Sequence, residues 1–171
     1  QRVVRQLGES DLKGHVTIAT SISQADVIVN QLGDHIDVVT EPERRDTFPA
    51  IALAASYLKY EKSCADEEVV VVMPCDPFTE AGYFKVIEQM VHAVDDNVAD
   101  LVLMGITPTY PSAKYGYVVP DELKLKGGIF SVKRFTEKPN VATAEYLIKE
   151  NVFWNGGVFA FKLGYMMNIV E

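Results

Sequence analysis

The segment Met-Pro-Cys-Asp-Pro at residues 73–77 carries one carboxylate directly after a strongly apolar run. An aspartate at the end of a buried strand, here Asp76, could hold a divalent cation against phosphate oxygens. Magnesium typically takes one or two protein carboxylates together with phosphates and water. Pro74 would end the strand that leads to it. The alternative is an Asx-type turn in which Asp76 bonds to the backbone, and these residues leave the two interpretations equally open.

A second candidate loop, residues 41–50, is charged and contains Arg45, Thr47 and Pro49. It follows a predicted strand and leads into a predicted helix, where Pro49 suits the first turn. The free N–H groups of a helix N-terminus favour an anion or the polar edge of a ring. The alternative is a solvated charged loop that caps the helix.

Three further segments place glycines or polar groups near predicted strands. Gly116, between two tyrosines, would let a ligand approach the backbone closely, or it would be a bend that enters a strand. Glu137 and Lys138 supply a hydroxyl acceptor and a point charge for phosphate, although Glu-Lys-Pro is also a common surface turn. Asn155 precedes two glycines and offers an amide together with exposed backbone N–H groups.

Apolar runs alternate with amphipathic stretches along the chain, and these elements must position the loops. The clearest element is the run of four valines and a methionine at 69–73. It has no polar alternation, so it predicts a central strand covered by helices on both faces. A capping-box pattern at Ser21 and Gln24 opens a predicted helix that ends at Gly33. The other predicted strands are 16–19, 36–39, 101–106, 117–119, 129–135 and 158–161, and the other predicted helices are 49–60, 80–94 (capped by Thr79), 140–148 and 164–170.

Strands and helices alternate up to residue 106, and a β-rich part with one helix follows, which predicts an α/β fold. We expect an open, mostly parallel mixed sheet with helices on both faces. Ligands of such sheets bind at the carboxyl ends of strands, near a switch in strand order. The candidate loops should therefore sit just after strands. Phe153 and Trp154, beside Asn155, are expected to be core residues.

Composition limits the class of protein. The chain has 171 residues, of which 48% are hydrophobic and 23% charged, and its net charge is −8. We therefore expect one globular domain over residues 1–171, with neither nucleic acid nor an anionic membrane as a default partner. No apolar run approaches the roughly 18 residues of a membrane span. The three histidines are scattered. Cys64 and Cys75 have no CxxC spacing, so we expect buried free thiols in a reducing cytoplasm.

Taken in order, the candidate loops resemble those of the sugar-nucleotidyltransferases, and among these the mannose-1-phosphate guanylyltransferases, also called GDP-mannose pyrophosphorylases. The motifs are Arg-x-Thr-x-Pro-Ala, Pro-x-Asp, Gly-Ile-x-Pro-Thr, Tyr-Gly-Tyr, Phe-x-Glu-Lys-Pro and Trp-Asn-x-Gly. The resemblance runs from about Val16 to the end of the chain. Residues 134–144 and 153–157 are its most specific parts, and residues 105–111 favour a guanylyl donor over thymidylyl and uridylyl donors.

The resemblance implies a Rossmann-like nucleotide-diphospho-sugar transferase fold. It also implies transfer of a guanylyl group from GTP to mannose-1-phosphate, which gives GDP-mannose and pyrophosphate. Residues 1–106 would form the nucleotide-binding part and residues 107–171 the sugar-phosphate-binding part. By this resemblance the partners are small molecules, and we also expect a homodimer in the cytoplasm.

The resemblance also assigns roles to the candidate residues. Asp76 would be a catalytic Mg²⁺ ligand, and Lys138 would be catalytic because it holds and neutralises the sugar phosphate. The remaining sugar contacts would come from Glu137, Asn155 and the backbone at Gly116. The nucleotide would be bound by Arg45, Thr47, Pro49 and Pro74, with Thr47 facing the guanine.

Some family features are not found in this sequence. The glycine-rich loop that wraps the triphosphate would precede residues 1–7, and the second magnesium aspartate would follow Glu171. We therefore expect a fold truncated at both ends and, for the chain as given, little or no catalysis. Pro77 stands where many relatives carry histidine, which removes one N–H. The alternatives are another nucleotide donor or hexose-1-phosphate, a non-catalytic relative that binds nucleotide sugars, and a glycosyltransferase of related fold.

Overall fold

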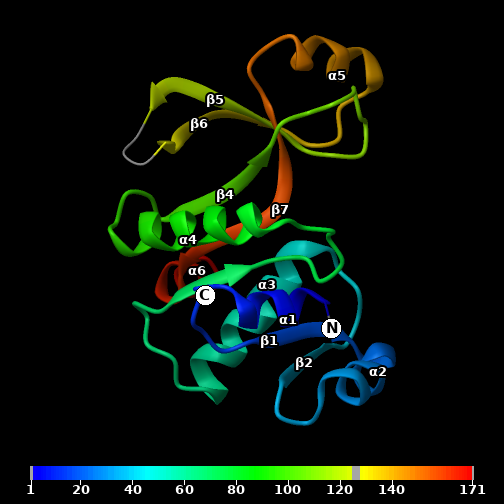
Figure 1. Cartoon of the computed structure of the whole chain (residues 1–171), viewed down its shortest axis with the longest axis vertical. Helices are drawn as coiled ribbons and strands as arrows, with labels where there is room; N and C mark the ends of the chain where they lie inside the picture. The colour runs from blue at the N-terminus through cyan, green and yellow to red at the C-terminus, as the bar shows by residue number, and fades with distance from the viewer. Residues whose placement is uncertain (1, 125–127, 171) are drawn as a thin grey trace.

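The computed structural model describes residues 2–124 and 128–170. Its elements alternate between helix and strand up to β4, as the sequence predicts (Figure 1). In chain order they are α1 (Arg2–Glu9), β1 (Thr17–Ser21), α2 (Ile22–Leu32), β2 (Asp37–Glu41), α3 (Thr47–Ser56), the π-helical turn η1 (Tyr57–Glu61), β3 (Val69–Val72), α4 (Ala81–Asp95), β4 (Leu101–Ile106), β5 (Tyr117–Lys124), β6 (Phe130–Thr136), α5 (Val141–Ile148), β7 (Phe153–Lys162) and α6 (Leu163–Val170). Among the described residues, no helix combines the length and apolarity that crossing a membrane requires.

The strands form two sheets. β1 and β2 pair in parallel, and the larger sheet has the order β3-β7-β5-β6, with β4 also paired to β7. The α/β class and the mixed sheet are confirmed, but parallel neighbours occur only between β1 and β2 in the described part of the chain. β3 and β4, which α4 connects, run in the same direction. However, β7 lies between them and is antiparallel to both.

Helices cover both faces of β3, which confirms the expectation from its valine run. Val69 and Val71 pack with α4 in one apolar cluster, whereas Val70 and Val72 pack with α3 and α6 in a second. The strand therefore lies between two layers of helix, and its alternate side chains contribute to both cores. Figure 1 shows α4 crossing β4 and β7, and β7 running from the end of the molecule that holds β5, β6 and α5 toward α6.

Helix caps differ from the sequence-based expectations in mechanism. Ser21 is the N-cap of α2, but its side chain makes no capping bond, and Gln24 instead accepts a hydrogen bond from the hydroxyl of Thr20 at 3.2 Å. The predicted capping box is therefore wrong, while the helix start and its end at Gly33 are right. Thr79 does not cap α4 either, because Glu80 is the N-cap residue and Thr79 bonds to Gln6 of α1.

A third apolar cluster joins α5 to β5 and β7 around Tyr117, which is fully buried. The phenol oxygen of Tyr117 accepts a hydrogen bond from the backbone N–H of Ser112 at 2.9 Å and donates to the Ser112 carbonyl at 3.0 Å. Ser112 is also buried. This closed pair of bonds fixes the loop that precedes Gly116.

Replacing Tyr117 with phenylalanine is therefore expected to reduce the free energy of unfolding by about 1–3 kcal/mol, because a buried backbone donor and acceptor lose their partner. Urea unfolding followed by circular dichroism measures this change. Tyr146→Phe is the matched control, since Tyr146 is 60% exposed and its ring lies on the surface of α5. A Tyr117→Phe protein as stable as the control variant would contradict the structural role of the phenol.

Candidate active site

The candidate site lies along one edge of β7. Trp154 of β7 pairs with Ile106 of β4 and with Tyr117 of β5, so β4 and β5 lie on opposite edges of the strand. Phe159 pairs with both β3 and β4, so β3 shares an edge with β5. Between them, the segment 155–158 pairs with no strand on that edge among the described residues. β3 ends beside this opening, because its last residue pairs with Phe159.

Three of the predicted site residues meet at the Asn155 end of this opening. The backbone N–H of Asn155 donates to the carbonyl of Gly116 at 2.8 Å. A Cβ built on Gly116 would lie 2.8 Å from Oε2 of Glu137, so the Glu137 carboxylate rests directly against the Gly116 backbone. The structure thus brings together Gly116, just before β5, Glu137, just after β6, and Asn155 of β7, which are up to 39 positions apart in the sequence (155 − 116).

Lys138 extends this group, because its ammonium lies 3.2 Å from Oε1 of Glu137. The side chains of Lys138 and Glu137 are 64% and 56% exposed, so both can reach a ligand in solvent. The backbone of Lys138 has φ +41°, a left-handed conformation that a non-glycine residue rarely adopts. We call Gly116, Glu137, Lys138 and Asn155 the sugar-phosphate cluster.

The side chain of Asn155 has a defined orientation. Its Oδ1 accepts a hydrogen bond from the backbone N–H of Gly157 at 3.0 Å, and Gly157 has φ +70°. The Nδ2 group has no hydrogen-bond partner among the described residues, so it is available to a ligand. Asn155 would therefore act as a hydrogen-bond donor in this site.

Asp76 lies on the same edge of β7 but outside this cluster. The loop of residues 73–80, here called the Asp76 loop, leaves β3 beside Phe159, four residues from Asn155 and thus about 13 Å away along the strand. Asp76 is exposed and makes no hydrogen bond or ion pair with the described residues. The Asx-turn alternative therefore has no supporting hydrogen bond. Cys75, expected to be a buried thiol, is also exposed, because the chain leaves the sheet at Pro74, while Cys64 is half-buried.

The donor set of this region fits a cation shared with a phosphate ligand. No group of three or more histidine, cysteine or carboxylate side chains lies together among the described residues. A single free carboxylate is nevertheless sufficient for magnesium when phosphate oxygens and water supply its other ligands. Asp76 satisfies that condition, since nothing in the described part of the chain neutralises it.

The predicted nucleotide-binding residues are not in contact with the sugar-phosphate cluster in any described interaction. Thr47 is the first residue of α3 and Pro49 lies in its first turn, as predicted, and both are exposed. Arg45 is also exposed, and its guanidinium pairs with Glu43 at 2.8 Å. Pro74 is half-buried where the chain leaves β3. The N-terminus of α3 is therefore open to solvent, with its first N–H groups available.

An aromatic group beside the cluster was not predicted. Tyr110 and Tyr115 pack against Trp154 with ring centroids 5.1 and 4.8 Å away. A side-chain hydrogen bond to Tyr110 raises the pKa of the Tyr115 phenol above its usual value. Trp154 is buried, as expected of a core residue, but its indole N–H has no hydrogen-bond partner among the described residues. In the sequence, the Tyr-Gly-Tyr motif could have pointed to Tyr115. Tyr110 lies in residues 105–111, which carry only the family resemblance.

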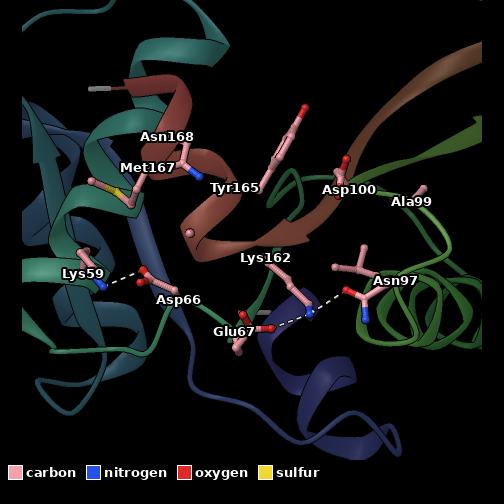
Figure 2. Close-up of a pocket in the computed structure, with 12 residues that line it drawn as sticks. Lys59, Asp66, Glu67, Asn97, Ala99, Asp100, Lys162, Tyr165, Met167 and Asn168 are labelled. Atoms are coloured by element: carbon pink, nitrogen blue, oxygen red, sulfur yellow. Dashed lines mark hydrogen bonds and ion pairs between the residues drawn. The ribbon is translucent and has the colours of Figure 1, made fainter.

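A hollow with a volume of about 440 Å³ lies elsewhere, at the other end of β7 (Figure 2). None of the predicted site residues lines it. Figure 2 shows that its lysines are already neutralised: Lys59 pairs with Asp66 at 2.6 Å, and Lys162 pairs with Glu67 at 2.6 Å. An anionic ligand would have to displace these carboxylates. This hollow is therefore a poorer candidate than the opening beside Asn155.

Comparison with known proteins identifies the family of this chain. The Nucleotidyl transferase family model matches residues 15–170. A mannose-1-phosphate guanylyltransferase of Escherichia coli is 32% identical over 156 residues, a match that covers 79% of this chain and 29% of that protein. The chain therefore spans less than a third of the length of this curated relative.

Solved structures show the same fold. A protein of Thermus thermophilus described as a mannose-1-phosphate geranyltransferase superposes with a TM-score of 0.82 at 26% identity, covering 98% of this chain and 48% of that one. A Helicobacter pylori protein described as a mannose-6-phosphate isomerase superposes with a TM-score of 0.77 at 21% identity, covering 98% and 62% of the two chains. The family match extends over nearly all of the described strands and helices, so this chain belongs to the Nucleotidyl transferase family.

Proposed function

We propose that this chain is part of an enzyme that transfers a guanylyl group from GTP to mannose-1-phosphate, giving GDP-mannose and pyrophosphate. The observation that carries the proposal is the convergence of Gly116, Glu137, Lys138 and Asn155 beside the opening in the edge of β7. The names of the curated relatives, which are mannose-1-phosphate guanylyltransferases, support the choice of donor and acceptor. A homodimer and a cytoplasmic location stay predictions.

In this reaction an oxygen of the sugar phosphate attacks the α-phosphorus of GTP, and pyrophosphate leaves from the opposite side. No covalent bond to the protein is needed, so the protein acts by holding the two substrates in line and by offsetting their charge. The Lys138 ammonium would bind the sugar phosphate, with Glu137 holding that ammonium in place. Glu137 and the Nδ2 group of Asn155 would bond sugar hydroxyls. Gly116 is buried beneath Phe135 and Glu137, so the expected direct approach of the sugar to its backbone is replaced by a supporting role: its lack of a side chain leaves room for the Glu137 carboxylate.

The nucleotide would lie on the other side of the opening, toward Pro74 and the N-terminus of α3. Thr47 would face the guanine, and Arg45 and Pro49 would flank it. Asp76 would hold Mg²⁺ against the phosphate oxygens. When bound, that ion would neutralise negative charge on the phosphate undergoing transfer. Residues 1–106 would thus serve mainly the nucleotide and residues 107–171 mainly the sugar phosphate.

Calorimetry of the 171-residue chain with GDP-mannose, with and without MgCl₂, tests the proposal. We expect magnesium to tighten binding of GDP-mannose by about tenfold, or about 1.4 kcal/mol, because Asp76 would hold an ion that offsets the phosphate charge. Asp76→Asn should remove this gain and leave magnesium-free binding unchanged. Asp100→Asn is the matched control, since Asp100 is an exposed carboxylate just before β4, at the opposite end of the sheet.

A parallel screen of GTP, UTP, dTTP, ATP and CTP distinguishes the guanylyl donor from its relatives. Preference for GTP supports the proposal, and a stronger preference for another nucleotide overturns the choice of donor while leaving the nucleotidyl transfer class intact. A chain that binds GDP-mannose with magnesium-independent affinity, unaffected by Asp76→Asn, would exclude the assigned role of Asp76.

A further inference from the structure

Helix α1 has two adjacent faces: one packs against the apolar core, and the other contacts the Asp76 loop. Val3 is buried, and Leu7, one turn later, packs against the apolar cluster that contains Phe84 of α4. Arg2 and Gln6, which are also one turn apart, lie beside these anchors. They contact residues more than 70 positions away in the sequence, all of them in the Asp76 loop.

The contacts of Arg2 and Gln6 cover three consecutive residues of that loop. The Arg2 guanidinium donates a hydrogen bond to the carbonyl of Pro77 and lies 4.9 Å from the centre of the Phe78 ring. Gln6 and Thr79 bond reciprocally: Nε2 of Gln6 donates to the Thr79 carbonyl at 3.2 Å, and the Thr79 hydroxyl donates to Oε1 of Gln6 at 3.4 Å. We call these interactions the α1–loop contacts.

The Asp76 loop has little else to hold it in place. Residues 73–80 form neither helix nor strand, and Phe78 is 84% exposed. Asp76 itself has no partner among the described residues. Its position is therefore determined by the two ends of the loop, at β3 and α4, and by the α1–loop contacts that begin at the very next residue, Pro77.

We infer that Arg2 and Gln6 are positioning residues for Asp76: they hold residues 77–79 against α1 and thereby fix the carboxylate at the opening beside β7. The inference rests on the proposed function, in which Asp76 holds Mg²⁺ against the phosphates of the ligand. Groups that orient a metal ligand without touching the metal typically change its affinity 10–100-fold when removed. The α1–loop contacts are that kind of support, supplied by a helix remote in sequence.

The test uses the 171-residue chain and the variants Arg2→Ala, Gln6→Ala and the double variant. The first measurement is hydrogen exchange of the peptide covering residues 75–80 without metal or ligand. We expect faster exchange in the double variant, because the loop is released. The second is the magnesium-dependent gain in GDP-mannose affinity, which should fall from about tenfold to little or none in the double variant. Arg5→Ala is the matched control and should change neither quantity: Arg5 is an exposed arginine on the same helix and forms an ion pair with Glu9 at 3.9 Å.

A double-mutant cycle on Gln6 and Thr79 distinguishes a role in positioning Asp76 from a general loss of structure. Gln6→Ala removes both bonds of this pair, whereas Thr79→Val removes the hydroxyl bond and leaves the bond to the Thr79 carbonyl. Each change should reduce the magnesium-dependent gain, and combining them should reduce it no further than Gln6→Ala alone. Thr79→Ser retains the hydroxyl and should restore most of the gain. Because Thr79→Val leaves α1 intact, it also tests the inference if Gln6→Ala fails to fold.

The outcomes are distinguishable. If wild-type protein gains affinity with magnesium, Asp76→Asn loses that gain and the Arg2 and Gln6 variants keep it, the inference is overturned and the proposed function stands. If wild-type protein shows no magnesium-dependent gain at all, the proposed role of Asp76 fails and the inference fails with it. Additive losses in the Gln6–Thr79 cycle would also overturn the inference, since the two residues would then act separately.

Discussion

Lys138→Ala is expected to weaken binding of mannose-1-phosphate about 30-fold, because a charge-assisted hydrogen bond to phosphate contributes about 2 kcal/mol. The unfolding free energy should change little. The side chain is 64% exposed, and its one described partner, Glu137, is also on the surface. Calorimetry with mannose-1-phosphate and urea unfolding measure the two quantities on the same protein. Lys133→Ala, an exposed lysine of β6, is the matched control and should alter neither.

The backbone of Lys138 allows a sharper version of this experiment. Its φ of +41° is unfavourable for any residue with a side chain and acceptable for glycine. Lys138→Gly should therefore be more stable than Lys138→Ala by about 1 kcal/mol, while both variants bind mannose-1-phosphate equally poorly. If Lys138→Ala melts many degrees lower and binds as wild type does, Lys138 is structural and its assignment fails.

Much of the fold could be predicted from local sequence patterns. The valine run at 69–72 has no polar alternation, and the structure covers both of its faces with helices. Gly33 ends α2, and Pro49 lies in the first turn of α3, because each residue has backbone properties that suit one place in a helix. These are local effects, which a single segment of sequence contains in full.

The position and length of β7 could not be predicted in the same way. The sequence indicated a strand only at 158–161, whereas β7 begins at Phe153. Asn155 and the two glycines after it are typical of a turn, but here pairing with β4 and β5 overrides that preference. The placement of β7 between β3 and β4 depends on contacts between distant segments, which leave no local signal. The α1–loop contacts were missed for the same reason.

Only part of the candidate site could be predicted from the sequence. The rule that ligands bind where strands end, together with the family resemblance, brought Gly116, Glu137, Lys138 and Asn155 into one prediction, and the structure does place these four together. The aromatic packing of Tyr110 and Tyr115 on Trp154 was not anticipated, because aromatic residues in such a stretch are more often core. The roles of Arg45, Thr47, Pro49 and Pro74 stay predictions, since no described contact links them to the cluster.

Gly116→Ala is expected to reduce affinity for GDP-mannose more than tenfold at a small cost in stability. The backbone of Gly116 is not in the left-handed region, so alanine is allowed there. However, its Cβ would lie 2.6 Å from Cζ of Phe135 and 2.8 Å from Oε2 of Glu137, which is too close for either atom to stay. Phe135 is 45% exposed and the Glu137 side chain 56% exposed, so both can turn outward into solvent. We expect a loss of about 1 kcal/mol of unfolding free energy and a displaced carboxylate.

Calorimetry with GDP-mannose and urea unfolding measure these effects, and Gly82→Ala in α4 is the control. A Cβ at Gly82 meets nothing within 4 Å, so that change should stabilise the helix by about 0.5–1 kcal/mol and leave binding unchanged. Two further variants separate the displaced ring from the displaced carboxylate. If the Phe135 ring causes the loss, adding Phe135→Ala to Gly116→Ala restores binding. If Glu137 causes it, as we expect, that addition has no effect, and Glu137→Ala added to Gly116→Ala costs nothing more, because the carboxylate has already left the backbone against which it rests.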